Sequence, residues 1–396
     1  MSAPSQPPAF PLATSTWDDA ELAALQSVIA GGRFTMGPLV AEFERLAAEA
    51  FGSQHAVMVN SGSSANLLAV AAAVLDPRID LNPGDEVLVP AVSWATTYYP
   101  LHQYGLRLKF VDIDVDTLNM DLDLAEQAIG PRTKGVFAVN LLGNPNDFAR
   151  LTALAQQHGL VLLEDNCESL GARFEERSAG TFGLMGTLSS FFSHHISTME
   201  GGLVLTDDEP LHQMLVSLRA HGWTRELPVD NHVHPKTGDA FDDLFRFVLP
   251  GYNVRPLEMS GALGIHQLAK APGLIAGRRE NAAYFLEVMA SLAGDVRVQR
   301  ETGESSWFGF SLVLEGALAG RRREVVAAFA EAGIEARPIV AGNFTKNPVM
   351  RHLDTVVPDE LPAADTIDAN GLFVGNHHFP IRPALDLLRD TLAAVR

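Results

Sequence analysis

Short, continuous runs of apolar residues alternate with segments of mixed apolar and polar residues over the first half of the chain. Buried strands of a parallel sheet show such continuous runs because both of their faces are covered. The apolar runs lie at residues 55–60, 85–91, 107–114, 133–142 and 160–166. Helical patterns lie between them at residues 64–75, 123–130 and 147–159. The alternation predicts an α/β fold whose mostly parallel sheet is covered by helices on both faces.

The pattern changes from about residue 255 onward. A long helical region at residues 256–292 leads to an apolar strand at 306–315 and a helix at 322–333. This order indicates a smaller α+β unit. The chain is therefore expected to divide into a large domain with an N-terminal arm, residues 1–254, and a small C-terminal domain, residues 255–396.

The amino-acid composition limits the classes of molecule that the protein is expected to bind. The chain has 396 residues, and 29 Lys+Arg against 48 Asp+Glu give it a formal charge of -19. Nucleic acid and anionic membrane surfaces require clustered positive charge, so neither is expected as a partner. Cys167 is the only cysteine, which excludes an intramolecular disulfide and fits a reducing cytoplasm. Residues 1–15 lack the basic start and apolar run of a secretory signal, and no apolar stretch is long enough to span a bilayer.

Three predicted strands are followed by residues that suit a ligand site, and ligands bind at the carboxyl ends of parallel strands. Residues 61–66, SGSSAN, enter a helix whose free amides suit a phosphate, although they are also ordinary helix-capping residues. Trp94 follows the second strand and could be a core residue or a flat platform for a ligand. Asp165 ends a later strand and could cap a helix or direct its carboxylate into a site.

Together, Ser63, Trp94 and Asp165 suit pyridoxal phosphate. That cofactor needs a phosphate cup, a flat group over its ring, and a carboxylate that keeps its pyridine nitrogen protonated. The three residues follow one another along the chain in that order.

Two adjacent histidines, His194 and His195, lie in the segment SSFFSHHISTMEGG, residues 189–202. A strand that carries Phe191 and Phe192 is expected to end there, and another is expected to begin at residue 201. On their own, two histidines in such a turn are ordinary turn residues. Whether they have a function must be judged from the neighbouring residues.

The chain resembles the DegT/DnrJ/EryC1/StrS sugar aminotransferase family from FTMGPLVAEFE, residues 34–44, to GLFVGNH, residues 371–377. This resemblance implies the aspartate aminotransferase-like fold of fold-type I pyridoxal phosphate enzymes. In that family a lysine that holds the cofactor covalently lies six residues before the Glu of E-G-G, and counting back from Glu200 gives His194. The chain has five lysines. Lys109 lies within a predicted strand, Lys134 lies just before one, and the other three lie in polar or helical segments. None of them is therefore expected to replace the family's lysine.

A histidine at that position resembles the branch of the family that makes 3-deoxysugars by 3-dehydration. One type in that branch uses an iron–sulfur cluster and a reductase, but Cys167 alone cannot hold a four-cysteine cluster. NLLGNPN, residues 140–146, and RAHGWTR, residues 219–225, resemble the other type, which uses L-glutamate and no reductase. This implies loss of the C3 hydroxyl from a nucleotide-linked 4-keto-6-deoxyhexose, with GDP-4-keto-6-deoxy-D-mannose as the best candidate. His194 would carry protons, and 2-oxoglutarate and ammonia would be released.

The resemblance also implies roles for the residues around pyridoxal 5'-phosphate or its amine form, pyridoxamine 5'-phosphate. Gly62 and Ser63 would bind the phosphate through amides and a hydroxyl, and Ser189 would add a second hydroxyl. Trp94 would stack on the ring, and Asp165 would pair with the pyridine N–H.

Three further positions complete the expected site, for which no metal is expected. Glu168 lies where most relatives carry glutamine against the ring, and its alternative is a solvated loop carboxylate. His221 and Asn253 would also contact the cofactor, Asn253 from the second subunit of a homodimer with shared sites. His195 is taken as a structural neighbour of His194. Three arginines are candidates for the carboxylates of glutamate or the substrate diphosphate: Arg219, Arg255 and Arg337.

Two rival functions remain open at this point. An aminotransferase that tolerates histidine would leave the nitrogen on the sugar and release no ammonia. A non-catalytic nucleotide-sugar-binding protein with the same fold would catalyse no reaction.

Overall fold

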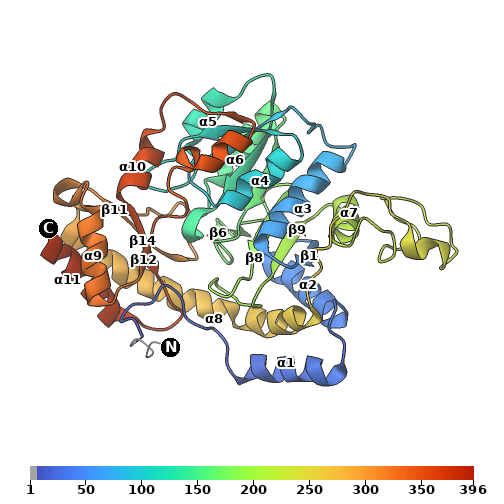
Figure 1. Cartoon of the computed structure of the whole chain (residues 1–396), viewed down its shortest axis with the longest axis horizontal. Helices are drawn as coiled ribbons and strands as arrows, with labels where there is room; N and C mark the ends of the chain where they lie inside the picture. The colour runs from blue at the N-terminus through green and yellow to red at the C-terminus, as the bar shows by residue number, and fades with distance from the viewer. Residues whose placement is uncertain (1–6) are drawn as a thin grey trace.

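The computed structural model describes residues 7–396 and contains a large mixed sheet and a smaller antiparallel sheet (Figure 1). The large sheet has eight strands in the order β1-β9-β8-β5-β4-β2-β3-β13. β9 runs antiparallel to β1 and β8, and every other neighbouring pair is parallel, which confirms the predicted mostly parallel α/β sheet. The strands are β1 (His55–Val59), β2 (Glu86–Pro90), β3 (Arg107–Val111), β4 (Thr133–Val139), β5 (Val161–Asp165), β8 (Met185–Ser189), β9 (Gly202–Thr206) and β13 (Thr355–Val356).

Helices cover both faces of this sheet because each strand carries apolar side chains on both sides. One face packs against α3, α4 and α7, and α3 is buried almost all round because its turns consist of alanine, leucine and valine. The other face packs against α5 and α6, and against α2 with the first half of α8. The helices up to this point are α1 (Asp19–Gly31), α2 (Pro38–Phe51), α3 (Gly62–Leu75), α4 (Ala95–Gln103), α5 (Leu122–Ala128), α6 (Phe148–His158) and α7 (Glu209–Arg219).

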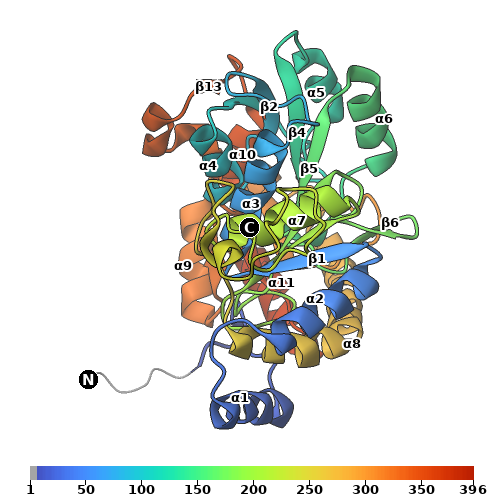
Figure 2. The ribbon, with the colours of Figure 1, turned by 90° about the vertical axis from the view of Figure 1, so that its right-hand side faces the viewer.

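The smaller sheet has the strand order β10-β11-β14-β12 and encloses a second apolar core with α9, α11 and the second half of α8. Phe10 from the N-terminal arm is fully buried in this core. The arm continues into α1, which packs along α8 below the rest of the molecule (Figure 2). The elements are α8 (Glu258–Met289), β10 (Val296–Val298), β11 (Gly309–Leu314), α9 (Arg322–Ala332), β12 (Ala336–Arg337), α10 (Pro362–Asn370), β14 (Gly371–Gly375) and α11 (Arg382–Val395), besides a short hairpin of β6 (Arg173–Phe174) and β7 (Arg177–Ser178).

The C-terminal part of the chain contributes to both sheets. β13 pairs in parallel with β3, so a segment beyond residue 255 forms one edge of the large sheet. The division into domains at residue 254 stays a prediction. Within residues 7–396, no helix combines the length and the apolar character needed to cross a bilayer.

Two predictions about strands were wrong. β8 ends at Ser189, so Phe191 and Phe192 lie in the following loop, where 39% and 50% of their surface is exposed. The Ser190 N–H still donates to the Gly201 carbonyl as the β8–β9 ladder ends, and the chain then turns at Phe192 and Ser193, where the His194 N–H donates to the Phe191 carbonyl. Lys134 lies inside β4 and not before it.

Candidate active site

A cleft of about 450 Å³ opens where β1, β2, β4, β5 and β8 end. These strands run in the same direction, so the loops after them meet at one edge of the sheet. Arg337 and Phe373 of the smaller sheet, and Phe308 just before its strand β11, also line the cleft. The predicted cofactor residues Gly62, Ser63, Trp94, Asp165, Glu168 and Ser189 and the predicted catalytic His194 all line this cleft.

The N-terminus of α3 forms a cup at one end of the cleft. Ser61 caps the helix, and its Oγ accepts a hydrogen bond of 3.1 Å from the Ser64 N–H. A Cβ on Gly62 would lie 2.8 Å from both Cys167 Sγ and Ser189 Cβ, so only glycine lets the helix terminus approach the end of β8 this closely. Amides of a first helical turn beside the hydroxyl of Ser189 suit a phosphate group.

The E-G-G motif has a packing role beside this cup. A Cβ on Gly202 would collide with the Ser61 carbonyl, and one on Gly201 would collide with the hydroxyls of Thr198 and Ser190. The two glycines therefore let β9 begin directly against the loop that leads into α3. This gives a physical reason for the motif from which His194 was counted.

Asp165 ends β5, and only 5% of its surface is exposed. Its Oδ2 accepts hydrogen bonds from Asn66 Nδ2 at 2.8 Å and from Thr97 Oγ1 at 2.7 Å. Its Oδ1 accepts one from the Cys167 N–H at 3.2 Å. Donors from two helices and from the loop directly after β5 thus fix the orientation of this carboxylate. Asn66 and Thr97 were missed in the sequence, where their only signal was a position in the first turns of two helices that follow strands.

Trp94 lies at the start of α4, and 59% of its surface is exposed. This exposure excludes the alternative that Trp94 is a core residue. Trp94 lines the cleft as a flat aromatic surface. The first turn of α4 is tied to the start of α3, because Ser63 Oγ donates a hydrogen bond of 3.0 Å to Thr96 Oγ1.

Glu168 is a half-buried carboxyl group in the cleft and not a solvated one. Its Oε2 accepts a hydrogen bond of 3.2 Å from the Leu142 N–H. Burial raises its pKa to about 7; the bond from Leu142 lowers the pKa and the charge of Asp165 raises it. Near neutral pH the group is therefore protonated part of the time, and it can then donate a hydrogen bond as a glutamine would.

His194 extends into the cleft from the loop after β8. Its ring meets Phe308 edge-on at 5.0 Å and Phe191 at 5.8 Å, measured between ring centroids. Its Nδ1 is buried and has no hydrogen-bond partner among residues 7–396. Burial, together with the charge of Arg278, lowers the pKa of His194 to about 4. The imidazole is thus neutral at physiological pH, with a nitrogen available to accept a proton.

His195 has different surroundings. Its side chain is fully buried, and its Nε2 lies 3.0 Å from the Ser306 carbonyl oxygen, which accepts its hydrogen bond. It is absent from the lining of the cleft. These contacts fit the interpretation of His195 as a structural neighbour that anchors the loop.

Lysine is absent from the residues that line the cleft. Four of the chain's lysines form ion pairs with carboxylates elsewhere, and Lys236 donates to two backbone carbonyls. The partners are Glu86 for Lys109, Asp80 for Lys134, Asp18 and Glu21 for Lys270, and Asp365 and Asp368 for Lys346.

His221 and Asn253 lie beside each other, outside the lining of the cleft. Ala220 pairs with Asn253 in an isolated bridge, and the His221 N–H donates to the Tyr252 carbonyl at 2.7 Å. Their contact with the cofactor stays a prediction.

Of the three candidate arginines, Arg337 is the one that lines the cleft. Arg219 is buried, with Glu44 and the Met58 carbonyl as its partners. The Arg255 Nε donates to Asn253 Oδ1 at 3.0 Å.

The model of the DegT/DnrJ/EryC1/StrS aminotransferase family matches residues 15–385. The chain belongs to this family. The chain is 54% identical to a GDP-4-keto-6-deoxy-D-mannose 3-dehydratase of Escherichia coli O55:H7, over 97% of its own length and 99% of that protein. The fold is therefore that of the family's fold-type I enzymes, as predicted.

Two solved structures match this family member along nearly its whole length. The E. coli GDP-4-keto-6-deoxy-D-mannose-3-dehydratase with bound hydrated PLP superposes with a TM-score of 0.95 at 53% identity, covering 98% of this chain and 100% of that one. A GDP-4-keto-6-deoxymannose-3-dehydratase with a trapped PLP-glutamate geminal diamine superposes with a TM-score of 0.94 at 53% identity, covering 97% and 100%.

Proposed function

We propose that this protein is a pyridoxal phosphate-dependent 3-dehydratase that converts GDP-4-keto-6-deoxy-D-mannose into GDP-4-keto-3,6-dideoxy-D-mannose. L-Glutamate is the co-substrate, and 2-oxoglutarate and ammonia leave in equal amounts with the deoxysugar. The oxygen lost from C3 of the sugar balances the oxygen gained when glutamate becomes 2-oxoglutarate and ammonia. The observation that carries the proposal is His194 at the position of the family's lysine, in a cleft that no lysine lines.

The cleft fits the cofactor at three points. The start of α3 and Ser189 make a phosphate cup that a side chain on Gly62 would fill. Trp94 offers an exposed aromatic face, and Asp165 offers a carboxylate held by three donors. When bound, pyridoxal phosphate supplies an electron-poor ring that takes up the electrons of a breaking C–H bond.

The residues of the cleft orient the reactants and move protons. Asp165 would hold the proton on the pyridine nitrogen, and Glu168 would contact the ring as a neutral carboxylic acid. His194, which lines the cleft, would take the proton from the breaking C–H bond and return one to the departing hydroxyl. Phe308 and Phe191 pack edge-on against this imidazole and shield part of it from water.

Arg337 is proposed to bind the carboxylates of glutamate or the diphosphate of the sugar nucleotide. It lies on β12 of the smaller sheet, across the cleft from the cofactor cup, and its side chain is exposed. A guanidinium can bind either anion with two parallel hydrogen bonds.

A homodimer with shared sites would complete this arrangement. The segment before Asn253 exposes three aromatic side chains, Phe241, Phe245 and Phe247, with 82%, 66% and 59% of their surface accessible. Such exposed apolar groups favour a protein partner. A second copy that covers them would bring Asn253 and His221 toward the neighbouring cofactor. A cytoplasmic location is proposed because the single cysteine fits a reducing compartment.

The proposed function is tested by incubating the purified protein with glutamate and a panel of 4-keto-6-deoxy nucleotide sugars carrying GDP, CDP or dTDP. Product mass should show the loss of one oxygen, most rapidly with GDP-4-keto-6-deoxy-D-mannose. A product in which an amino group replaces the ketone would identify an aminotransferase instead, and no turnover with any sugar would indicate a binding protein.

A further inference from the structure

A second cluster of chemically reactive side chains lies at the opposite end of β1 from the catalytic cleft. His55 is the first residue of β1, while the cleft lies after its last residue. Glu209 and His212 lie on the first turn of α7, three positions apart and therefore on one face of the helix. The proposed reaction uses none of these three residues.

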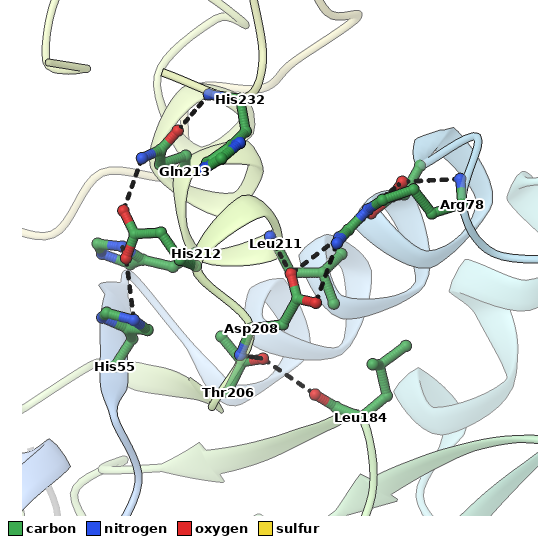
Figure 3. Close-up of polar contacts among 11 residues, drawn as sticks. His55, Arg78, Leu184, Thr206, Asp208, Leu211, His212, Gln213 and His232 are labelled. Carbon is green, nitrogen blue, oxygen red and sulfur yellow. Dashed lines mark hydrogen bonds and ion pairs between the residues drawn. The ribbon is translucent and has the colours of Figure 1, made fainter. Parts of the chain in front are cut away.

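The cluster has the dimensions of a metal site. Glu209 Oε2 lies 3.0 Å from His55 Nε2 and 3.6 Å from His212 Nδ1, and all three ligand atoms lie within 4.8 Å of one another. Ligand atoms at about 2.1 Å from a tetrahedral ion are about 3.4 Å apart. The two imidazole rings stack on each other, as Figure 3 shows. Their centroids are 4.3 Å apart and their planes differ by 5°. Because the nitrogen lone pairs lie in the ring planes, one ring would tilt out of this stack when both nitrogens bind one ion.

One nitrogen of the cluster lacks a hydrogen-bond partner. His212 Nδ1 is buried and accepts or donates no hydrogen bond within residues 7–396, since its distance to the Glu209 carboxylate is too long. A buried polar atom left without a partner is costly. A cation between the three groups would supply that partner.

The Glu209 carboxylate is also oriented by a hydrogen bond from a neighbouring side chain, as metal ligands commonly are. Gln213 Nε2 donates to Glu209 Oε1 at 2.6 Å, and the His232 N–H donates to Gln213 Oε1 at 2.7 Å. Figure 3 shows His232 and Gln213, joined by this hydrogen bond, above the His212 and His55 rings. Gln213 is buried, so its amide has few other orientations.

We propose that His55, Glu209 and His212 bind a divalent transition-metal ion of the zinc class, apart from the catalytic cleft. Two imidazoles and one carboxylate suit Zn²⁺, Co²⁺ or Ni²⁺, whereas Mg²⁺ and Ca²⁺ prefer shells of oxygen ligands. The ion ties the start of β1 to the first turn of α7 and, through Gln213, to the backbone at His232. Its role is to stabilise this edge of the large sheet.

The test measures Co²⁺ and Zn²⁺ binding to the holoenzyme by equilibrium dialysis against a competing chelator. One ion should bind per chain, Co²⁺ should give the visible absorption of a low-coordinate nitrogen and oxygen site, and excess Mg²⁺ or Ca²⁺ should not displace it. Glu209→Gln and His212→Gln should abolish binding, and Gln213→Ala should weaken it about 10- to 100-fold. His158→Gln is the matched control, because His158 is an exposed histidine at the end of α6; it should bind as the wild type does.

Melting temperatures without metal will show whether each variant folds. Zn²⁺ should raise the melting temperature of the wild type and of His158→Gln but not that of His212→Gln. The proposal is overturned if the wild-type protein binds no ion, or if Glu209→Gln and His212→Gln bind Co²⁺ as tightly as the control. If both variants fail to fold, the spectrum of the wild type still decides. Co²⁺ bound to the wild-type protein with the faint absorption of the hydrated ion would overturn the proposal.

Discussion

The ring of His194 packs edge-on against Phe308, with 5.0 Å between ring centroids and 62° between ring planes. Phe308 comes from the segment that enters β11 and stacks in turn on Phe373 of β14, at 5.9 Å. The proposed proton carrier is therefore held by the smaller sheet, although it belongs to a loop of the larger one. This contact also helps to bury the imidazole, and burial is the main cause of its lowered pKa.

Phe308→Ala should lower kcat about 10- to 100-fold, the scale of a misplaced catalytic group. Water entering beside His194 should also raise its pKa toward the ordinary value, which moves the acid limb of the pH–rate profile to higher pH. Phe308→Tyr should restore most of the rate because it keeps the ring. The pH dependence of kcat for the three proteins measures this, and an unshifted acid limb in Phe308→Ala would show that Phe308 does not control the environment of His194.

His194→Asn should still bind the cofactor, because the phosphate cup and Asp165 are unchanged, but should lose at least about 100-fold in dehydration. His194→Lys should instead bind the cofactor covalently, so that borohydride fixes it to the chain. Single-turnover kinetics and mass spectrometry measure the two effects. Efficient borohydride fixation of the cofactor to the wild-type chain would mean that another lysine reaches the cleft.

His195→Asn provides the matched comparison for His194→Asn. It removes a fully buried imidazole that hydrogen-bonds to Ser306, so it should lower the free energy of unfolding by about 1–3 kcal/mol. Properly folded His195→Asn should retain far more activity than His194→Asn. Equal losses of turnover in the two variants would assign a chemical role to His195.

Glu168→Gln should change how stability depends on pH. The pKa of Glu168 rises from 4.5 to about 7 on folding, so between these values the folded wild type binds more protons than the unfolded chain and loses stability as pH rises. Glutamine does not ionise. The variant should therefore match the wild type near pH 4.5 and exceed it by about 1–3 kcal/mol at pH 8, the upper limit following from about 1.4 kcal/mol per pKa unit. Denaturant unfolding across this range provides the measurement, and a constant difference would contradict the raised pKa.

The proposed shared site can be tested by complementation. His194→Asn and Asn253→Asp should each be inactive alone, and their mixture should regain activity after subunit exchange, because one hybrid site carries both wild-type residues. Exchange is followed by mass spectrometry of differently tagged chains. Verified exchange without recovered turnover would place Asn253 outside the partner's site.

The large sheet could be predicted, and the residues of the proposed phosphate cup could be placed at one edge of it, because their signals are local. Continuous apolar runs marked the strands, and the small and polar residues directly after them marked the edge where ligands bind. The end of β8 was misjudged because Phe191 and Phe192 have strand-like side chains, although β8 ends at Ser189 and the chain turns at Phe192 and Ser193.

The remaining parts of the site depend on contacts between distant segments. Asn66 and Thr97 converge on Asp165 from two helices, and nothing in their own sequence neighbourhoods indicates that target. Arg337 could be separated from Arg219 only after Arg219 was found buried against Glu44. In the same way His55 meets α7 only because β1 lies beside β9 at the edge of the sheet, so no metal site was expected.

The source of the electrons is the central claim, and product stoichiometry tests it most directly. The protein, its cofactor, glutamate and GDP-4-keto-6-deoxy-D-mannose should be combined without any reductase, flavin or NADPH, and 2-oxoglutarate, ammonia and 3-deoxysugar quantified together. A glutamate-driven 3-dehydratase predicts equal amounts of all three products. An aminosugar formed without ammonia, or no turnover until a reductase is added, would contradict it.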